Sequence, residues 1–317
     1  MVTQKDIEEA AKIIRNGGLV AFPTETVYGL GANAYDANAV AKIFIAKQRP
    51  SFDPLIVHIC HNEDIGKLSL NEDERVYKLA KNFWPGPLTI VVPKSNIIPD
   101  IVTSGLESVG LRMPDNDIAL RLIDAAGCPI AAPSANKFGK LSPTSAEHVR
   151  KQLPELSCIL DSGRTIVGVE STVITLETDG FRILRPGAIT SDHLSKVLPM
   201  SGKLSEDILI SASPGLMKSH YSPEKPVYIL GEHDIPQELS NAAFLSFNGS
   251  APEDYKTIAY LSHSGNLQQA AVNLFGALHW LEESDIDFIV SEAIPEQGIG
   301  IAIMDRLRKA AYRFHLK

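Results

Sequence analysis

Hydroxyl, carboxylate and glycine residues follow one another in segment 22–31 of this sequence, Phe-Pro-Thr-Glu-Thr-Val-Tyr-Gly-Leu-Gly. A short apolar run ends there at Pro23 and is followed by Thr24, Glu25 and Thr26. Rigid turns of this kind hold backbone N–H groups and short hydroxyls in fixed directions, which suits the binding of an anion. The segment therefore predicts one wall of an anion-binding cleft.

The same combination recurs in five further segments. Each places Ser, Thr, Arg, Lys or His beside Gly or Pro near the predicted end of a strand, and the segments are 47–58, 83–89, 108–114, 131–144 and 168–187. Arginine contributes a planar guanidinium group that matches the geometry of phosphate and carboxylate groups. By themselves, these residues predict a small anionic ligand bound in a cleft.

Several well-characterised catalytic signatures are missing. The sequence contains no G-x-x-x-x-G-K-[ST] phosphate loop, no G-x-S-x-G of hydrolases and no H-E-x-x-H of zinc peptidases. The nine histidines show no metal-ligand spacing, and segment 298–300, Gly-Ile-Gly, is interpreted as the tight start of a helix rather than as a phosphate loop. Because Cys60, Cys128 and Cys158 form no C-x-x-C pair, we expect buried, reduced thiols and neither disulfides nor a zinc site.

Helices and strands alternate along the chain. Apolar periodicity and cap residues predict helices at 3–16, 37–47, 75–83, 118–126, 146–152, 267–281 and 299–314. Short apolar runs predict strands at 19–22, 55–59, 88–92, 109–112, 130–132, 158–161, 171–176, 181–184, 227–230, 243–247, 257–261 and 288–290. This alternation predicts an α/β protein. Since several strands of the first part are only a few residues apart, we expect a mixed sheet there.

The length of 317 residues predicts two domains. We expect a catalytic domain at 1–200 and a smaller, Rossmann-like α/β domain at 227–317. The segment 201–226 between them is rich in Ser, Pro and Gly. A connection of that length is usually functional, so we expect a linker that folds over the site.

The balance of charges bears on the binding partner. Thirty Lys and Arg against 38 Asp and Glu give a net charge of −8, which argues against a dedicated nucleic-acid binder. A local cationic site for an anion is compatible with an acidic whole. The sequence has no apolar run of 18 residues and no secretion signal, so we expect a cytoplasmic protein without membrane contact.

In this order, the motifs closely resemble those of the YrdC-type family, and specifically its longer members, the two-domain threonylcarbamoyl-AMP synthases. The resemblance covers residues 5–190 almost continuously. Segment 213–223, Ser-Pro-Gly-Leu-Met-Lys-Ser-His-Tyr-Ser-Pro, resembles the linker that distinguishes these enzymes from single-domain relatives. The resemblance implies a twisted mixed sheet of the YrdC type in the first domain and a smaller α/β second domain.

The resemblance also implies a reaction. In this family the amine of L-threonine captures bicarbonate as a carbamate, which attacks the α-phosphate of ATP and releases pyrophosphate. The protein then supplies no covalent nucleophile; it aligns the carbamate and stabilises the developing charge, with Mg²⁺ on the phosphates. A downstream threonylcarbamoyl-transferase complex uses the product to modify an adenosine of tRNA, and weak tRNA contact by this chain is compatible with that.

Residue by residue, the resemblance implies two groups of ligands. The threonine pocket comprises Thr26, His58, Arg112, the backbone of Ala132, and Ser171. The ATP site comprises Arg49, Asp53, Ser108, Ser134, Ser142, Arg185 and, from the linker, Tyr221. Lys47 and Arg49 supply charge stabilisation, and the metal ligands stay open. Asp53 stands where many relatives have Asn, and a carboxylate near phosphates is unfavourable unless it faces ribose or Mg²⁺; Ser108 stands where Thr is commoner.

Each of these residues also has a structural explanation. His58 can be a hydrogen-bonded core histidine, and Arg112 and Arg185 can form surface salt bridges. Lys47 sits at the predicted C-terminus of a helix, where the helix dipole favours a cation, and Ser and Thr residues cap turns. Trp84, flanked by prolines on its C-terminal side, is expected to pack rather than to stack on a base. The whole pattern, rather than any one residue, favours a ligand site.

Three other functions stay open. The main alternative is a protein of the YrdC-like fold that binds double-stranded RNA or tRNA on a concave basic surface without turnover. A carbamoyl-transfer domain of hydrogenase maturation would need acylphosphatase or zinc-finger regions that this sequence lacks. The third is a regulatory protein that keeps the pocket without the activity.

Overall fold

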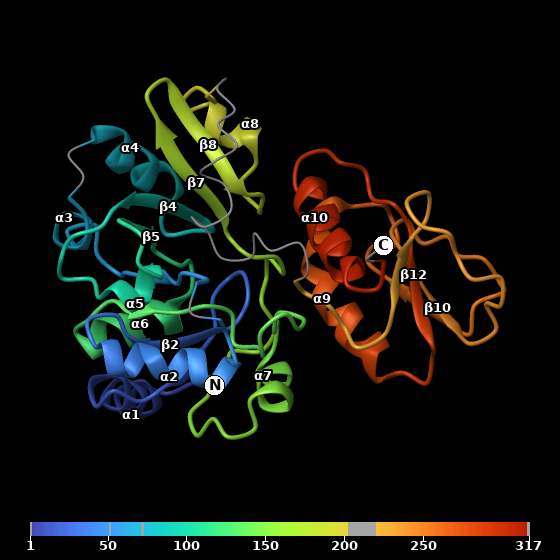
Figure 1. Cartoon of the computed structure of the whole chain (residues 1–317), viewed down its shortest axis with the longest axis horizontal. Coiled ribbons are helices and arrows are strands. Elements are labelled where there is room, and N and C mark those ends of the chain that lie inside the picture. Colours follow the sequence, from blue (N-terminus) through green and yellow to red (C-terminus); the bar gives the residue numbers. More distant parts are fainter. Residues whose placement is uncertain (1, 51, 71–72, 202–219, 316–317) are drawn as a thin grey trace.

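The computed structural model describes residues 2–50, 52–70, 73–201 and 220–315. Two β-sheets organise them, one of eight strands and one of four. Figure 1 shows the sheets as the centres of two α/β units, the first coloured blue to yellow and the second orange to red. The predicted α/β class is confirmed.

The larger sheet is mixed, as predicted. Its strands are β1 (Val20–Phe22), β2 (Gly29–Asn33), β3 (Ile56–His58), β4 (Leu88–Pro93), β5 (Ser108–Arg112), β6 (Ile130–Ala131), β7 (Thr172–Glu177) and β8 (Gly180–Arg185). They follow the order β1-β2-β6-β3-β5-β4-β7-β8. β3 pairs with β5 and β4 with β7 in parallel, and the other neighbours are antiparallel.

Helices pack on both faces of this sheet. They are α1 (Gln4–Arg15), α2 (Ala37–Lys47), α3 (Asp64–Leu68), α4 (Glu74–Phe83), α5 (Asp100–Thr103), α6 (Asp117–Ala126), α7 (Ala146–Gln152) and α8 (Ser191–Ser195). Ala21 of β1 belongs to an apolar cluster with α2 and α4, whereas Val20 and Phe22 belong to a cluster with α1 and α6. Successive side chains of a strand point to opposite faces, so the two clusters lie on opposite sides of the sheet.

The register of the central strands brings predicted site residues together. Parallel pairing sets His58 opposite Arg112 at the carboxyl ends of β3 and β5. β6 runs antiparallel to β3, and Ser134, which follows β6, forms an isolated bridge with Gly29 at the start of β2. These pairings bring segments that are distant in the sequence side by side in the central strands.

The smaller sheet is entirely parallel, in the order β11-β10-β12-β9. Its elements are β9 (Val227–Ile229), β10 (Ala242–Ser246), β11 (Thr257–Tyr260), α9 (Leu267–Glu283), β12 (Phe288–Ser291) and α10 (Gly300–Tyr312). A Cβ on Gly300 would lie 2.0 Å from the carbonyl oxygen of Pro295, so the start of α10 needs glycine. The tight-backbone interpretation of 298–300 and the Rossmann-like α/β architecture are confirmed.

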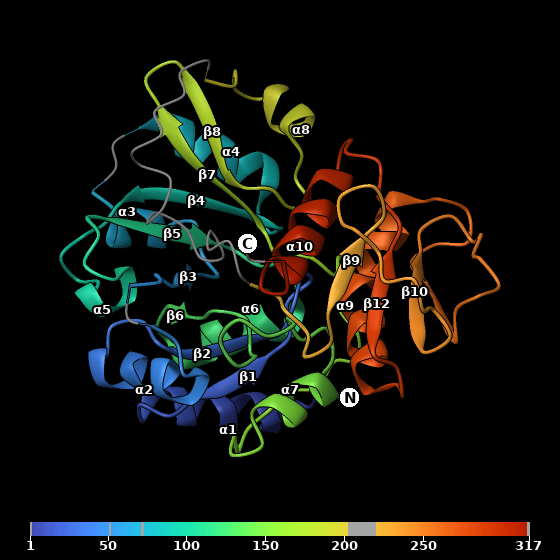
Figure 2. The same ribbon diagram turned by 45° about the vertical axis from the view of Figure 1, so that its right-hand side comes forward.

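The apolar core of the second unit continues into the first. Besides its own residues, this cluster contains Val27, Leu141 and Val169 from the first unit and Tyr221 from the predicted linker. Gly168 approaches α9 so closely that a Cβ there would lie 2.3 Å from the carbonyl oxygen of Ala271. Figure 2 shows α10 between the two sheets. The two units therefore share a packed interface.

Some predicted elements differ from the structure. The strand expected at 158–161 is reduced to a single bridge, because only Ala21 exchanges backbone hydrogen bonds with it, through Cys158 and Leu160. β2 and the short helices α3, α5 and α8 were not predicted, since they span too few residues to show a period. Trp84 packs in the core as expected, with its Nε1 donating to the carbonyl oxygen of Leu88 at 2.7 Å.

Three further expectations concern the linker, the thiols and the membrane. Most of the linker expected at 201–226 falls on 202–219 and lies outside the described residues. The cysteines are half-buried rather than buried, and desolvation raises the pKa of Cys60 and Cys128 to about 11. In the part of the chain that the structure describes, no helix combines the length and the apolar character needed to cross a membrane.

Candidate functional site

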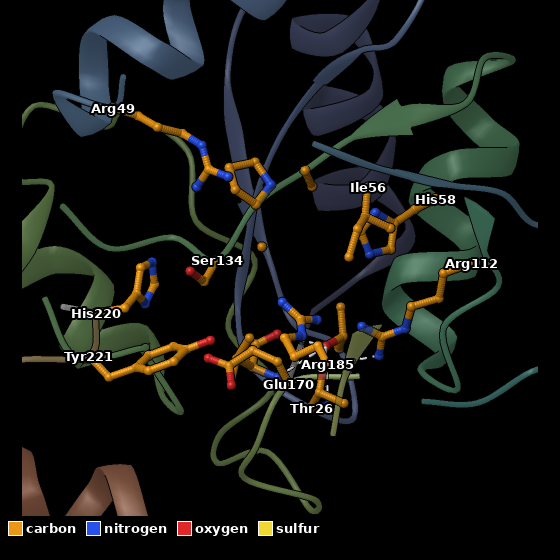
Figure 3. Close-up of a pocket in the computed structure, with 15 residues that line it drawn as sticks. Thr26, Arg49, Ile56, His58, Arg112, Ser134, Glu170, Arg185, His220 and Tyr221 are labelled. Atoms are coloured by element: carbon orange, nitrogen blue, oxygen red, sulfur yellow. Dashed lines mark hydrogen bonds between the residues drawn. The ribbon is translucent and has the colours of Figure 1, made fainter. Parts of the chain in front are cut away.

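Residues at the ends of β1, β3, β5, β6 and β8 line a cleft in the larger unit, and Figure 3 shows the 15 residues that line it. Eight of the residues predicted as ligands are among them: Thr26, Arg49, His58, Arg112, Ala132, Ser134, Arg185 and Tyr221. The others are Thr24, Val27, Gly29, Ile56, Pro133, Glu170 and His220. In Figure 3, His58 and Arg112 lie across the cleft from His220 and Tyr221. Motifs that are far apart in the sequence thus converge on one site.

Arg112 anchors one half of the cleft. Its Nη2 donates to the Oγ1 of Thr26 at 3.0 Å and lies 2.7 Å from Oε1 of Glu25 in a buried ion pair. Thr26 is held in turn by a 2.8 Å hydrogen bond between its hydroxyl and that of Thr24. The Nε of Arg112 has no hydrogen-bond partner among the described residues, so the guanidinium group keeps capacity for a ligand carboxylate.

His58 contributes a neutral ring to the same half. Burial, together with the positive charge of Arg112, lowers the pKa of His58 to about 3. Its ring packs edge-on against Phe22, with 5.9 Å between the ring centroids. The buried Nδ1 has no partner in the described ranges, and buried polar atoms normally have one. A core role accounts for the packing of this ring but leaves Nδ1 unexplained, whereas a ligand in the cleft would satisfy it.

Arg49 and Arg185 bring positive charge to the other half. Arg49 donates to the carbonyl oxygens of Asp53 and Pro54 at 3.1 and 3.0 Å, and it forms a 2.8 Å ion pair with the Asp53 carboxylate. Arg185 donates from Nε and Nη2 to the carbonyl oxygen of Ser171 at 3.1 and 3.0 Å. Burial lowers the pKa of both guanidinium groups from the usual value, yet arginine stays charged at neutral pH. Both are buried groups rather than surface salt-bridge partners.

Two lining residues, Glu170 and His220, had not been assigned a role. Glu170 accepts hydrogen bonds from the hydroxyl of Ser142 and, at 3.0 Å, from Nε of Arg306 on α10. Burial and the nearby charge of Arg49 hold the pKa of His220 well below its usual value, and its Nδ1 has no partner within the described residues. Glu170 lies in segment 168–187 and His220 in segment 213–223, both of which contain residues predicted as ligands. A carboxylate and an imidazole in such segments could have been predicted to line the cleft.

Lys47 does not line the cleft, but it contacts the backbone of the loop that carries the lining residue Ser134. Its buried Nζ donates to the carbonyl oxygen of Ser134 at 2.6 Å and also to that of Asn136. Burial holds the pKa of the Lys47 ammonium well below its usual value. The side chain therefore fastens the loop that presents Ser134.

Four other predicted ligands also lie outside the lining. Asp53 is bound to Arg49, and Ser142 donates to Glu170. The hydroxyl of Ser171 lies 2.8 Å from that of Thr89. Ser108, at the start of β5, borders a separate small cavity with Thr89. The structure thus places these polar groups next to lining residues or apart from the cleft.

One group of possible metal ligands exists elsewhere among the described residues. The ligand atoms of Cys60, His61 and Asp124 lie within 4.8 Å of one another at the surface. None of the three lines the cleft. The spacing in the sequence does not predict this group, because Asp124 is distant from the other two residues in the chain.

Family models match both units of the chain. A model described as Telomere recombination, which covers the Sua5, YciO and YrdC proteins, matches residues 12–187. A second model, described as Threonylcarbamoyl-AMP synthase, C-terminal domain, matches residues 189–312.

Individual relatives match over nearly the full length. Threonylcarbamoyl-AMP synthase from Pyrococcus abyssi is 42% identical over an alignment of 323 positions, which covers 96% of this chain and 94% of the relative. The Bacillus subtilis protein of the same name is 42% identical over 322 residues and covers 96% and 92%. The crystal structure of P. abyssi Sua5 complexed with L-threonine matches with a TM-score of 0.88 at 41% identity, covering 99% of this chain and 96% of that one.

Proposed function

The chain belongs to the family of two-domain threonylcarbamoyl-AMP synthases, and on that premise we propose that it converts L-threonine, bicarbonate and ATP into threonylcarbamoyl-AMP and pyrophosphate. The product is the activated group for a modification of tRNA. The observation that carries the proposal is the convergence of His58 and Arg112 with Arg49 and Arg185 on one cleft. A site of that kind can hold an amino acid beside a polyphosphate.

We assign L-threonine to the half of the cleft with Thr26, His58 and Arg112. The guanidinium group of Arg112 faces the substrate carboxylate, and the unpaired Nδ1 of neutral His58 binds the substrate hydroxyl or amine. The N–H of Ala132 donates to the carbonyl oxygen of Ile56 at 2.9 Å, so a contact with Ala132 uses its carbonyl oxygen. Ser171 acts indirectly, through its hydrogen bonds to Arg185.

ATP occupies the half with Arg49, Ser134 and Arg185 in this proposal, and Tyr221 closes over it. Lys47 positions Ser134 through the hydrogen bond to its carbonyl oxygen, and it contributes positive charge to the phosphate region. The remaining predicted contacts are Asp53, which orients Arg49, and the hydroxyls of Ser108 and Ser142.

The reaction requires alignment rather than a protein nucleophile. The threonine nitrogen forms a bond to the carbon of bicarbonate with loss of water. An oxygen of the resulting carbamate then bonds to the α-phosphorus of ATP while the bond to the pyrophosphate oxygen breaks. Holding two anions in line for that step requires fixed cations. In this proposal Arg49 and Arg185, which line the cleft, stabilise the charge of the departing pyrophosphate.

Mg²⁺ enters as part of the ATP substrate. Glu170 is the one carboxylate in the described lining, and its oxygens already accept from Ser142 and Arg306. The described lining therefore offers no free carboxylate for a resident ion. Mg²⁺ commonly keeps several waters and binds substrate phosphates, which fits this arrangement.

We assign the catalytic domain to residues 1–200, the linker that folds over the site to 201–226, and the second domain to 227–317. The product is passed to a threonylcarbamoyl-transferase complex, and we place both steps in the cytoplasm because ATP and tRNA meet there. Contact with tRNA is weak in this proposal, since a net charge of −8 gives little general attraction to phosphates.

A pyrophosphate-release assay tests the proposed function. Purified chain with ATP and Mg²⁺ is expected to release pyrophosphate only when L-threonine and bicarbonate are both present. Omitting either substrate provides the control for ordinary ATP hydrolysis. Tight, salt-sensitive binding of double-stranded RNA without this turnover would contradict the proposal and favour the RNA-binding alternative.

A further inference from the structure

A buried arginine of the second domain reaches the wall of the cleft. Arg306 lies on α10 and has 0% exposed surface. Its Nε donates to Oε2 of Glu170 at 3.0 Å, and Glu170 lines the cleft. Figure 2 shows α10 on the side of the second unit that faces the larger sheet. The two residues are 136 positions apart in the sequence, so this ion pair joins the two domains.

The same guanidinium group holds a second segment of the wall. Its Nη1 donates to the carbonyl oxygen of Pro186 at 2.7 Å, directly after the lining residue Arg185. Gly187 follows, and a Cβ there would lie 2.4 Å from the backbone nitrogen of Thr172. The turn that carries Arg185 is therefore packed against the segment that carries Glu170, and Arg306 is bound to both.

A third contact reaches the linker. The guanidinium carbon of Arg306 lies 5.5 Å from the centre of the Tyr221 ring. Phe275 of α9 packs against the same ring at 5.5 Å between centroids. Tyr221 has a left-handed backbone with φ of 58° and is almost completely buried, so its position depends on these neighbours from the second domain.

The charge of Glu170 gives these contacts a role in ligand binding. Burial alone would raise the pKa of the Glu170 carboxyl, but the charges of Arg306 and Arg185 outweigh burial and leave the pKa below its usual value. Glu170 is therefore ionised at neutral pH. An ionised carboxylate in the wall of a phosphate site repels the ligand unless a cation balances it.

We propose that Arg306 is a positioning residue for the nucleotide half of the cleft, through which the second domain completes the ATP site. It balances the charge of Glu170 and holds the Arg185 turn and Tyr221 in their places. This rests on the proposed function, because it takes the phosphates of ATP to occupy this half.

Calorimetry on the full chain tests the proposal with two ligands. The probes are L-threonine and, with Mg²⁺, an ATP analogue that has a methylene group between the α- and β-phosphorus. Arg306→Met removes the charge and keeps an apolar stem. We expect the affinity for the analogue to fall about tenfold or more, because Glu170 becomes an unpaired buried charge. The affinity for threonine should fall less than about threefold. Arg308→Met is the matched control on the same helix, since Arg308 is half-exposed and pairs with Glu232 and Glu296; it should change neither affinity.

A double variant separates a positioning role from a merely structural one. Adding Glu170→Gln to Arg306→Met removes the unpaired charge, so the affinity for the analogue should rise again several-fold, but stay below that of the parent chain because the contacts with Pro186 and Tyr221 remain lost. Glu170→Gln alone should raise that affinity, because it removes a negative charge from the wall of the cleft. The proposal is overturned if Arg306→Met binds the analogue with the affinity of the parent chain. It is also overturned if the affinities for both ligands fall equally and the double variant does not restore the affinity for the analogue.

Two further results keep the test decisive. If Arg306→Met does not fold, Glu170→Gln alone still decides: a tenfold loss of the analogue would mark Glu170 as a direct nucleotide ligand and overturn the proposal. Failure of the parent chain to release pyrophosphate would reject the proposed function instead. A parent chain that turns over normally, with an Arg306→Met variant that matches it, would reject only the inference about Arg306.

Discussion

The two halves of the cleft differ in what holds them in place. The half assigned to threonine is built within the larger sheet, where the register of β3 and β5 sets His58 beside Arg112. The half assigned to ATP is built from turns and depends on residues of the second domain, above all Arg306. Strand pairing positions the first half, whereas an interface between domains positions the second.

This difference indicates how the domains divide their work. A site fixed by backbone pairing within one sheet needs no other domain to form. A site whose wall contains a buried carboxylate needs its counter-charge, and the structure places that charge on α10. We therefore expect changes in the second domain to affect ATP far more than threonine.

The largest expected effect comes from removing residues 213–317. We predict that pyrophosphate formation falls on the order of 100-fold or more, because Glu170 loses its counter-charge and Tyr221 is absent. Residues 1–200 should stay folded and keep threonine binding, as measured by circular dichroism and calorimetry. Unchanged turnover would show that neither Tyr221 nor the second domain contributes, and equal loss of both ligands would show that the two halves are not independent.

Arg112→Ala tests the half of the cleft assigned to threonine. Loss of the guanidinium group should lower the affinity for threonine about 30-fold or more, because a buried charged hydrogen bond is removed. The affinity for the ATP analogue should change little. Calorimetry with each ligand measures both. Arg121→Ala is the control, since Arg121 is exposed on α6 and pairs with Asp117. Equal losses for the two ligands would mean that the pocket assignment is wrong.

Tyr221→Ala should have a smaller effect on the nucleotide half. We expect the ATP analogue to bind about tenfold more weakly, because the ring that packs against Arg306 and Phe275 is lost. Threonine affinity should stay the same. Tyr260→Ala serves as the control, as Tyr260 lies exposed on β11 and outside the cleft lining. A larger loss of threonine than of nucleotide would reverse the assignment of the two halves.

Of the changes considered, lowering the pH should have the smallest effect on the affinity for threonine. His58 is neutral in the folded state down to its pKa of about 3, so threonine affinity should not change between pH 8 and pH 5 on account of this ring. Stability behaves differently, because the unfolded chain takes up a proton near pH 6.5 and the folded chain does not. The free energy of unfolding should therefore fall as the pH drops below about 6.5, by about 2 kcal/mol at pH 5 from His58.

Chemical denaturation at pH 7.5 and pH 5 measures this acid effect on stability. His58→Gln should lose less stability on acidification than the parent chain, because it has no ring to protonate. An equal loss in both chains would mean that His58 does not stay neutral on folding. Threonine affinity that falls steeply between pH 8 and pH 6 in the parent would contradict the neutral ring directly.

Much of the larger unit was predictable from local pattern. The helix at 37–47 and the helix at 146–152 were predicted with their observed bounds, because cap residues and apolar periodicity are properties of a short window. The grouping of His58, Arg112 and Ser134 also followed from motifs near strand ends. By contrast, the strand expected at 158–161 lacked the pairing partner that would have completed it.

Charged side chains were harder to place. Lys47 was expected to add charge at the phosphates, yet it is bound to two backbone carbonyl groups behind Ser134. Arg306 carried no signal in the sequence, since it lies on a helix whose next arginine, Arg308, is a surface residue. A long cationic side chain has the same appearance in sequence whether it is buried in an ion pair or solvated.

The sequence by itself determined the α/β class, most of the helices and strands, and the set of motifs from which the cleft is made. These follow from periodicity and turn chemistry, which act between near neighbours in the chain. Only the tertiary structure decided which of those side chains face the cleft, and that a second domain provides the counter-charge for Glu170. Pairing of charges depends on distance in space and on exclusion of water, and neither exists until the two domains have packed together.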